Sequence, residues 1–210
     1  MPTKELATAL PDRPINAGQG KYQQILRAAV EVIAENGFAN SRVSVIAARA
    51  GVADGTIYLY FKSKDQILMA ALDDAFKGFL EKARAETATV SDPLLKLGAV
   101  IDLHLRAMSH NRALAVVLQT ELRQSAKFLA EFSQRQLRSY LQFLKDIISE
   151  GQSTGVFRND IPANVAVSCL FGALDDVVTA WVLNEKGYDL PKVGSAIRDL
   201  FLNGVAKRSE

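Results

Sequence analysis

The segment IAARAGVADGTI constrains the fold more than any other part of the sequence. It places Ala47, Gly51 and Ile57 at relative positions 0, +4 and +10. A helix-turn-helix needs a small residue where its two helices cross, a glycine that can take a positive φ in the turn, and an apolar residue that anchors the second helix. The spacing therefore predicts two short helices, about 43–50 and 54–60, joined by a turn at Gly51.

Apolar residues recur at three- and four-residue steps through most of the remaining chain, which is typical of amphipathic helices. No segment alternates apolar and polar residues between hairpin turn signals, so no strand is expected. We therefore predict an all-α protein of about nine helices. The other expected helices span about 21–36, 67–86, 93–109, 112–124, 127–150, 162–184 and 191–207.

Residues that favour helix ends support these ranges. Asp54 is expected to accept the free N–H groups at the start of the second short helix, and Ser63 with Gln66 is expected to form a capping box. The other expected start signals are Asp92-Pro93, Asp160 with Pro162, and Asp189 with Pro191, and the expected stop signals are Gly37, Gly151 and Gly187.

We expect a flexible leader over residues 1–19, a helix-turn-helix domain over 20–66, and a larger helical ligand-binding and dimerisation domain over 67–210. The net charge of the chain is only +2. Residues 1–66 hold 8 Lys/Arg against 6 Asp/Glu and so carry the whole surplus. Any binding of nucleic acid must therefore rest on a local basic surface.

A helix-turn-helix places its second helix in the major groove of DNA, where side chains near the helix start read base edges. Hydroxyl and ammonium groups beside that helix hold phosphates. Isolated from this context, the aromatic residues of the segment would read as ordinary core residues with solvated lysines. The helix-turn-helix spacing favours DNA contact instead. The predicted DNA-binding residues are Arg42, Ser44, Gly55, Thr56, Tyr58, Leu59, Tyr60, Lys62 and Lys64.

The segment VSVIAARAGVADGTIYLYFKSKDQIL resembles the DNA-binding signature of the TetR family of one-component repressors. The common pattern has Thr at the position of Arg42, Ser or Lys at Ala53 and Asp54, and often His at Leu59. These departures affect the residues that read bases, and hence the operator sequence, but not the fold.

The segments VEVIAENG, GVADGTIYLYFK, LQTELRQS and DDVVTAWVLNEKGYDL are similar to the FadR-like branch of that family in bacilli. Its members repress fatty-acid degradation genes and are released by long-chain fatty acyl-CoA. The resemblance implies a homodimer that binds a double-stranded DNA operator, with an acyl-CoA effector site in each C-terminal domain and no cofactor.

An acyl-CoA needs an apolar tunnel for its chain and cationic or N–H donors for its phosphorylated head. Composition alone favours the interpretation that the apolar residues between about 100 and 145 are bundle core and the arginines a solvated face; only the resemblance favours a ligand site. The predicted ligand-binding residues are Leu103, His104, Met108, Val117, Leu118, Glu121, Leu122, Arg123, Phe128, Tyr140, Phe143, Leu144, Phe171 and Asp175.

Two helices near the C-terminus are predicted to form half of a four-helix dimer interface. Gly172 and Ala173 would let a partner approach closely. The alternative is that the first of these helices is buried within its own domain. The predicted interface residues are Leu174, Val178, Trp181, Ile197, Leu200 and Phe201.

The sequence contains no pattern that predicts catalysis or metal binding. His104 and His110 lie six positions apart on different helix faces, and a single cysteine, Cys169, is typical of a reducing cytoplasm. No run approaches the length of a membrane span. Two alternatives remain: a multidrug or other small-molecule sensor with acidic residues in its pocket, and a cytosolic acyl-chain carrier or thioesterase, against which the helix-turn-helix argues.

Overall fold

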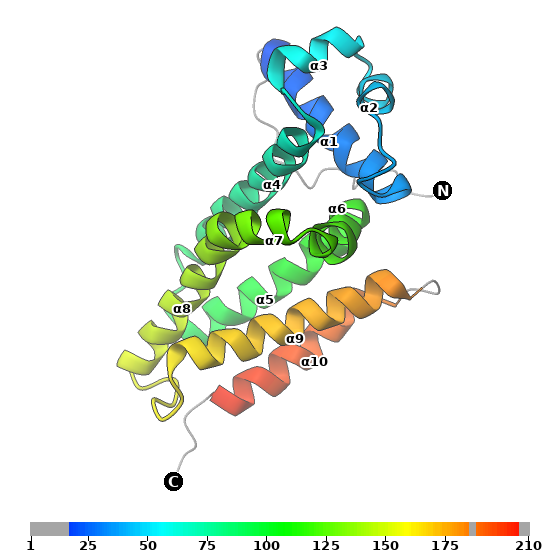
Figure 1. Ribbon diagram of the computed structural model, residues 1–210. Helices are drawn as coiled ribbons and strands as arrows, with labels where there is room; N and C mark the ends of the chain where they lie inside the picture. Colours follow the sequence, from blue (N-terminus) through cyan, green and yellow to red (C-terminus); the bar gives the residue numbers. More distant parts are fainter. Residues whose placement is uncertain (1–16, 185–187, 206–210) are drawn as a thin grey trace, which may run out of the picture. The chain divides into compact units, whose positions relative to one another are not determined.

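The computed structural model describes residues 17–184 and 188–205 of the 210-residue chain. Over these two ranges the regular structure is helical and no strand occurs, so the predicted all-α class is confirmed. When each uninterrupted helical stretch is counted once, the described residues form nine rods, the expected number. The chain divides into two compact units between Gly78 and Phe79, inside helix α4 (Figure 1).

The first unit is built from α1 (Ala17–Asn36), α2 (Val43–Ala50), α3 (Asp54–Tyr60) and the first part of α4 (Lys64–Thr87). Helix α1 packs on α2, and α2 packs on α3. Ala47 and Ile57 are fully buried at the positions that a helix-turn-helix requires. The short predicted helices therefore match α2 and α3 residue for residue.

The turn between α2 and α3 has the predicted left-handed glycine. Gly51 has a φ of 67°, and the next N–H, that of Val52, donates to the Ala47 carbonyl over 3.0 Å. The prediction for Asp54 is wrong: the N-cap of α3 is Ala53, without a side-chain hydrogen bond, and Asp54 lies in the first turn. A carboxylate there still interacts favourably with the positive end of the helix dipole.

The second unit contains α5 (Pro93–His110), α6 (Arg112–Val116), α7 (Ala126–Phe132), α8 (Arg138–Ser153), α9 (Ala163–Leu183) and α10 (Leu190–Val205). Helix α10 packs along α5 and α9, and α8 also packs against both (Figure 1). A π-helical turn (Val117–Glu121) and a 3₁₀ turn (Leu122–Gln124) extend α6. A second π-helical turn (Ser133–Leu137) joins α7 to α8, so each predicted long helix is one irregular rod.

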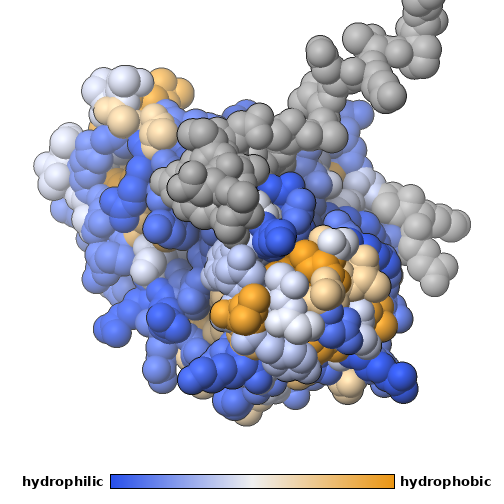
Figure 2. All heavy atoms as spheres, turned by 90° about the horizontal axis from the view of Figure 1, so that it is seen from above, coloured by the Kyte–Doolittle hydropathy of each residue, from blue (hydrophilic) through white to orange (hydrophobic). Residues whose placement is uncertain are grey.

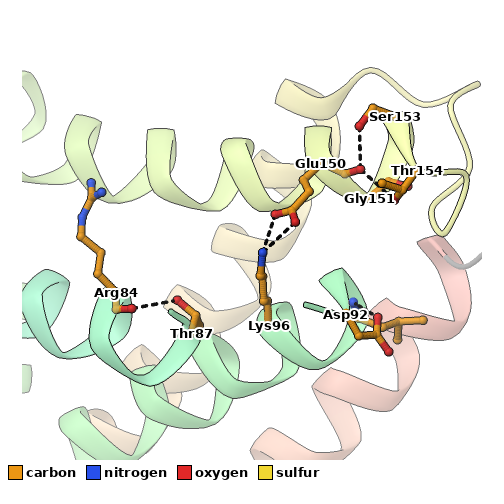
Figure 3. Close-up of polar contacts among 9 residues, drawn as sticks. Arg84, Thr87, Asp92, Lys96, Glu150, Gly151, Ser153 and Thr154 are labelled. Carbon is orange, nitrogen blue, oxygen red and sulfur yellow. Dashed lines mark hydrogen bonds and ion pairs between the residues drawn. The ribbon is translucent and has the colours of Figure 1, made fainter. Parts of the chain in front are cut away.

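The helix ends of this unit confirm some predicted signals (Figure 3). Asp92 caps α5 by accepting a hydrogen bond from the Leu94 N–H over 2.8 Å. Asp189 accepts one from the Lys192 N–H over 3.3 Å at the start of α10. The Lys96 ammonium lies 2.7 Å from a Glu150 carboxylate oxygen, which links α5 to α8.

Two predicted signals in this unit are wrong, and a third lies outside the described residues. Helix α8 continues past Gly151 to Ser153. The glycine serves close packing there, since a Cβ would lie 2.1 Å from the Phe157 ring. Asp160 does not cap α9, because the Asp160 carboxylate pairs with the Arg158 guanidinium. The N-cap of α9 is Pro162. Gly187 is the signal that the described ranges do not include.

Helix α9 corrects the expectation about apolar runs. It has 21 residues and is long and apolar enough to cross a membrane by length and composition, and 33% of its apolar window is buried in the protein. One such helix is weak evidence for a membrane span. Asp175 and Asp176 near its centre would be costly in lipid, so its exposed apolar surface is better explained by contact with protein.

Candidate functional site

Helix α3 presents one face to the core and another to solvent. Ile57 is fully buried, whereas its neighbours Tyr58 and Leu59 are 60% and 83% exposed. Gly55 is exposed and Thr56 is half-buried on the first turn. Figure 2, which views the protein from above, shows small apolar patches set among mostly hydrophilic surface. A short helix anchored by one apolar residue and exposing small, hydroxyl and apolar groups suits the reading of base edges.

Four other predicted DNA contacts have different surroundings. Arg42 is exposed and occupies the N-cap position of α2, and Ser44 is exposed in its first turn. The Tyr60 ring packs edge-on against Tyr22 with 6.1 Å between ring centroids, and the residue is 38% exposed. Lys62 is exposed, and its backbone N–H donates to the Gln66 side chain over 2.8 Å.

The predicted capping box forms at the start of α4. The Gln66 N–H donates to the Ser63 hydroxyl over 3.3 Å, and the return bond to the Gln66 side chain comes from the N–H of Lys62, one residue before Ser63.

Lys64 departs from the interpretation that its ammonium holds a phosphate. Its Nζ donates to three backbone carbonyls, those of Phe38, Ala39 at 3.3 Å and Ser41 at 2.8 Å. It also lies 4.4 Å from the centroid of the Phe38 ring. An ammonium has three N–H donors, and all three have acceptors here. Lys64 therefore fixes the loop after α1 and has no N–H left for a phosphate.

The predicted ligand-binding residues come from α5, the irregular rod after α6, α7, α8 and α9. Nine of them are buried: Leu103, Met108, Val117, Leu118, Leu122, Phe128, Tyr140, Phe143 and Leu144. His104, Glu121, Phe171 and Asp175 are partly accessible, and Arg123 is exposed. The set thus consists of an apolar interior with a few polar groups at partly accessible positions, as a ligand pocket requires.

Aromatic rings from four helices meet around Tyr140. His104 stacks on it with 5.6 Å between centroids, and Phe79 and Phe171 contact it edge-on at 5.2 and 6.2 Å. The His104 Nδ1 lies 3.0 Å from the Tyr140 hydroxyl. Phe79, on α4, was not among the predicted residues; the apolar periodicity of α4 marks it as inward-facing but does not reveal its partner rings.

Burial controls the protonation of this cluster. Desolvation lowers the pKa of His104 to about 4, although the Asp175 carboxylate acts in the opposite direction. Desolvation also raises the pKa of Tyr140. Both groups are therefore neutral at pH 7, and the cluster offers hydrogen bonds without net charge.

The lowered pKa predicts that acid destabilises the fold through His104. Between about pH 6.5 and pH 4 the unfolded chain binds a proton at this histidine that the folded chain does not bind, so stability falls as the pH falls. From pH 7 to pH 5 we expect His104 to account for a loss of about 2 kcal/mol in the free energy of unfolding.

Urea denaturation at the two pH values would measure this loss in the wild type and in His104→Asn. The exposed His110 provides the matched control His110→Asn. If His104→Asn shows the same pH dependence as both the wild type and His110→Asn, the His104 imidazole is not desolvated.

A polar network lies beside the aromatic cluster. The Arg123 guanidinium donates to both Asp175 carboxylate oxygens, at 2.6 and 2.7 Å, and to the Gln119 side-chain oxygen at 2.8 Å. The Thr179 hydroxyl donates to the same Gln119 oxygen over 2.8 Å. Asp175 thus already has a cationic partner, which leaves it poorly suited to attract a cationic ligand.

The predicted dimer interface is wrong for three residues. Leu174 and Val178 are 0% exposed and Trp181 is 8% exposed, so all three belong to the core of their own protomer. Leu200 is 76% exposed, and Ile197 and Phe201 are partly accessible on α10. The exposed stripe of α9 lies on its other side and consists of Val165, Cys169, Gly172, Ala173, Asp176, Ala180 and Leu183. We call this stripe the small-residue face.

No cluster of three or more potential metal ligands occurs among the described residues.

Two family models together match nearly all of the described chain. The model described as bacterial regulatory proteins, tetR family, matches residues 25–71. The model described as YsiA-like protein, C-terminal region, matches residues 72–204. The first covers the helix-turn-helix, and the second covers the helices that carry the aromatic cluster and the small-residue face.

Individual relatives agree with these matches over most of their length. The fatty acid metabolism regulator protein of Bacillus subtilis is 40% identical over 185 residues, 88% of this chain and 95% of its own. A structure of FadR from Bacillus halodurans has 37% identity and a TM-score of 0.85, over 93% of this chain and 100% of that one. The structure of B. subtilis FadR in complex with stearoyl-CoA has 40% identity and a TM-score of 0.82, over 88% and 99% of the two chains.

Proposed function

The chain belongs to the TetR family of bacterial regulatory proteins, and on this basis we propose that it is a cytoplasmic, dimeric repressor that long-chain acyl-CoA releases from a palindromic operator. The genes under its control would be those of fatty-acid degradation. Residues 20–66 would form the DNA-binding domain and 67–210 the ligand-binding and dimerisation domain. The observation that carries the proposal is the 40% identity to the fatty acid metabolism regulator protein of B. subtilis and to FadR of B. subtilis, which was solved in complex with stearoyl-CoA.

In the proposed DNA complex, α3 lies in the major groove. Thr56 and the 83% exposed Leu59 contact base edges and thymine methyl groups. Arg42, Ser44, Tyr58, Tyr60 and Lys62 hold the phosphates on either side, and Gly55 lets the backbone approach the duplex closely. The phosphate contacts supply affinity for any DNA, and the base contacts of Thr56 and Leu59 supply the preference for one sequence.

This division of roles predicts different results for Tyr58→Phe and Thr56→Ala. Removing the Tyr58 hydroxyl is expected to weaken binding to operator and to unrelated DNA by a similar factor, because phosphates are the same in every sequence. Replacing Thr56 is expected to change the ranking of operator variants by about 1 kcal/mol or more at one base pair. Fluorescence anisotropy with a set of singly substituted operators measures both; a uniform loss for Thr56→Ala contradicts its role.

The proposed ligand site lies in the second unit, among the nine buried apolar residues and the aromatic cluster. A long acyl chain needs such an extended apolar lining. The alternative function, a sensor of cationic drugs, would need an unpaired carboxylate in the site. Asp175 is instead paired with Arg123. This ion pair leaves neither charge free for a charged drug, and the extended apolar lining favours an acyl chain.

The proposed dimer joins two small-residue faces together with the exposed side of α10. Glycine and alanine on this face permit close helix approach, and Leu200 adds apolar area that is 76% exposed in the single chain. Two α9 and two α10 helices would then form a four-helix interface around a two-fold axis. A two-fold protein matches a palindromic operator with one α3 in each half-site.

The function can be tested on DNA from the region upstream of the gene for this protein. The protein is expected to bind this DNA and to lose affinity by about 10- to 100-fold on saturation with palmitoyl-CoA, which requires a preference of roughly 1.4 to 3 kcal/mol for the DNA-free arrangement. Shorter acyl-CoAs and free CoA provide the graded controls. Binding that no acyl-CoA of any length weakens would contradict the effector, and release of free CoA would indicate a thioesterase.

A further inference from the structure

A row of buried residues on the rod formed by α7, the π-helical turn and α8 has two polar side chains between apolar ones. Phe132, Gln136, Tyr140 and Leu144 follow one another at four-residue steps, and all four are buried. Gln136 is only 7% exposed and belongs to the π-helical turn. Such turns occur frequently at functional sites. Two polar groups, an amide and a phenol, thus lie in succession inside an apolar interior.

The Gln136 amide has an unmet hydrogen-bonding requirement. Its Oε1 is buried, and it is the one buried side-chain oxygen or nitrogen in the described part of the chain for which no hydrogen-bond partner is found. A buried acceptor without a donor costs about 1–3 kcal/mol. A water molecule or a ligand group that donates to this oxygen would remove the cost.

His104 supplies a second group without a hydrogen-bond partner, and this one is a donor. The Tyr140 hydroxyl is buried, and the only partner found for it within the described residues is the His104 Nδ1. The hydroxyl proton therefore points to Nδ1, which makes Nδ1 the acceptor and leaves the proton of the neutral ring on Nε2. No hydrogen bond in the described residues uses this Nε2–H, and His104 is partly accessible. The Nε2–H is thus a free donor next to the row that contains the free acceptor of Gln136.

We infer that His104 and Gln136 bind the thioester and the adjoining amide of an acyl-CoA, so that the site selects a thioester and not merely a long apolar chain. This inference rests on the proposed function. The His104 Nε2–H donates to the thioester carbonyl oxygen, and the Gln136 Oε1 accepts from the first amide N–H of the pantetheine arm. A sulfur and two methylenes separate these ligand groups, a span of roughly 5 Å. The His104 ring bonds to Tyr140, which lies about one helical turn from Gln136 along the rod, so the two side chains can belong to one site of this size.

The inference can be tested with two ligands that differ at one group. Palmitoyl-CoA has the thioester carbonyl, and the thioether S-hexadecyl-CoA has the same number of chain carbons but no carbonyl. Calorimetry is expected to show that the wild type binds the thioester about five- to tenfold more tightly, the worth of one hydrogen bond in a desolvated site. His104→Phe keeps a ring against Tyr140 and is expected to bind both ligands equally.

Gln136→Met tests the other group independently. Methionine fills a similar volume without an orphan acceptor, so this variant is expected to melt at the same temperature as the wild type or higher. It should bind both ligands about fivefold more weakly and keep the preference for the thioester. A purely structural role for Gln136 would change the melting temperature and leave both affinities unchanged.

The outcomes separate this inference from the function on which it rests. Equal affinity of the wild type for thioester and thioether overturns the assignment of His104, including the case in which both orphan groups hold only buried water, while acyl-CoA remains the effector. Unchanged affinities in Gln136→Met overturn the assignment of Gln136. If the wild type binds neither ligand, the acyl-CoA function itself fails.

Discussion

Replacement of Gly172 by arginine is expected to separate the dimer into folded protomers and to lower operator affinity by about 100-fold or more. Apart from the neighbouring residues and the backbone of its own helix, no heavy atom lies within 4 Å of the place where a side chain at Gly172 would begin, so arginine fits the single chain. At a two-fold interface, however, the same guanidinium would be pressed against its symmetry mate and stripped of water. A monomer holds one half-site only and loses the effective concentration that links two sites, a factor of about 10² to 10⁴.

Sedimentation equilibrium and fluorescence anisotropy measure the two parts of this result. Ser149→Arg adds the same charge to an exposed position of α8 and should leave both the dimer and operator binding intact. Leu174→Ala should instead lower the free energy of unfolding by about 2–5 kcal/mol, because this side chain fills the core of its protomer. If Gly172→Arg remains a dimer with normal operator affinity, the small-residue face is not the interface.

Lys64→Met is expected to lower the free energy of unfolding of the first unit by about 2–3 kcal/mol. The substitution removes three charge-assisted hydrogen bonds and leaves the Phe38, Ala39 and Ser41 carbonyls to find other donors. Chemical denaturation followed by the tyrosine signal, with hydrogen exchange of α1 and α2 as a local readout, measures the loss.

Lys62→Met is the matched comparison, two residues away. Lys62 is exposed, so its loss should leave stability unchanged, weaken binding to all DNA sequences, and reduce the slope of log affinity against log salt by about 1. The reverse pattern, in which Lys64→Met melts normally but loses the salt-dependent binding, would return Lys64 to the phosphate contacts.

The sequence predicted the helix-turn-helix well because its determinants are local. Ala47, Gly51 and Ile57 lie within one short segment, and each has a steric requirement that few other residues meet. Helix caps were less predictable. The Asp160 carboxylate pairs with Arg158, two residues earlier, instead of capping a helix. The cap of helix α3 comes one residue earlier than expected, so that Ala53 is the N-cap and Asp54 lies in the first turn.

Features that depend on distant residues could not be predicted. The Lys64 ammonium binds carbonyls 23 to 26 residues earlier in the chain, a contact that no local pattern reveals. Helix α9 is apolar on nearly every side, so its periodicity did not show which face is core. The larger side chains fill the core and the smaller ones remain exposed, which is the opposite of the initial assignment of Leu174 and Val178 to the interface.

The central claim is that operator and acyl-CoA favour different arrangements of one protein, and calorimetry of palmitoyl-CoA binding tests it most directly. The ligand would be titrated into free protein and into protein saturated with operator DNA. The account predicts that operator weakens palmitoyl-CoA binding by the same factor, about 10- to 100-fold, by which palmitoyl-CoA weakens operator binding. Equal affinity for the free and the DNA-bound protein would contradict it.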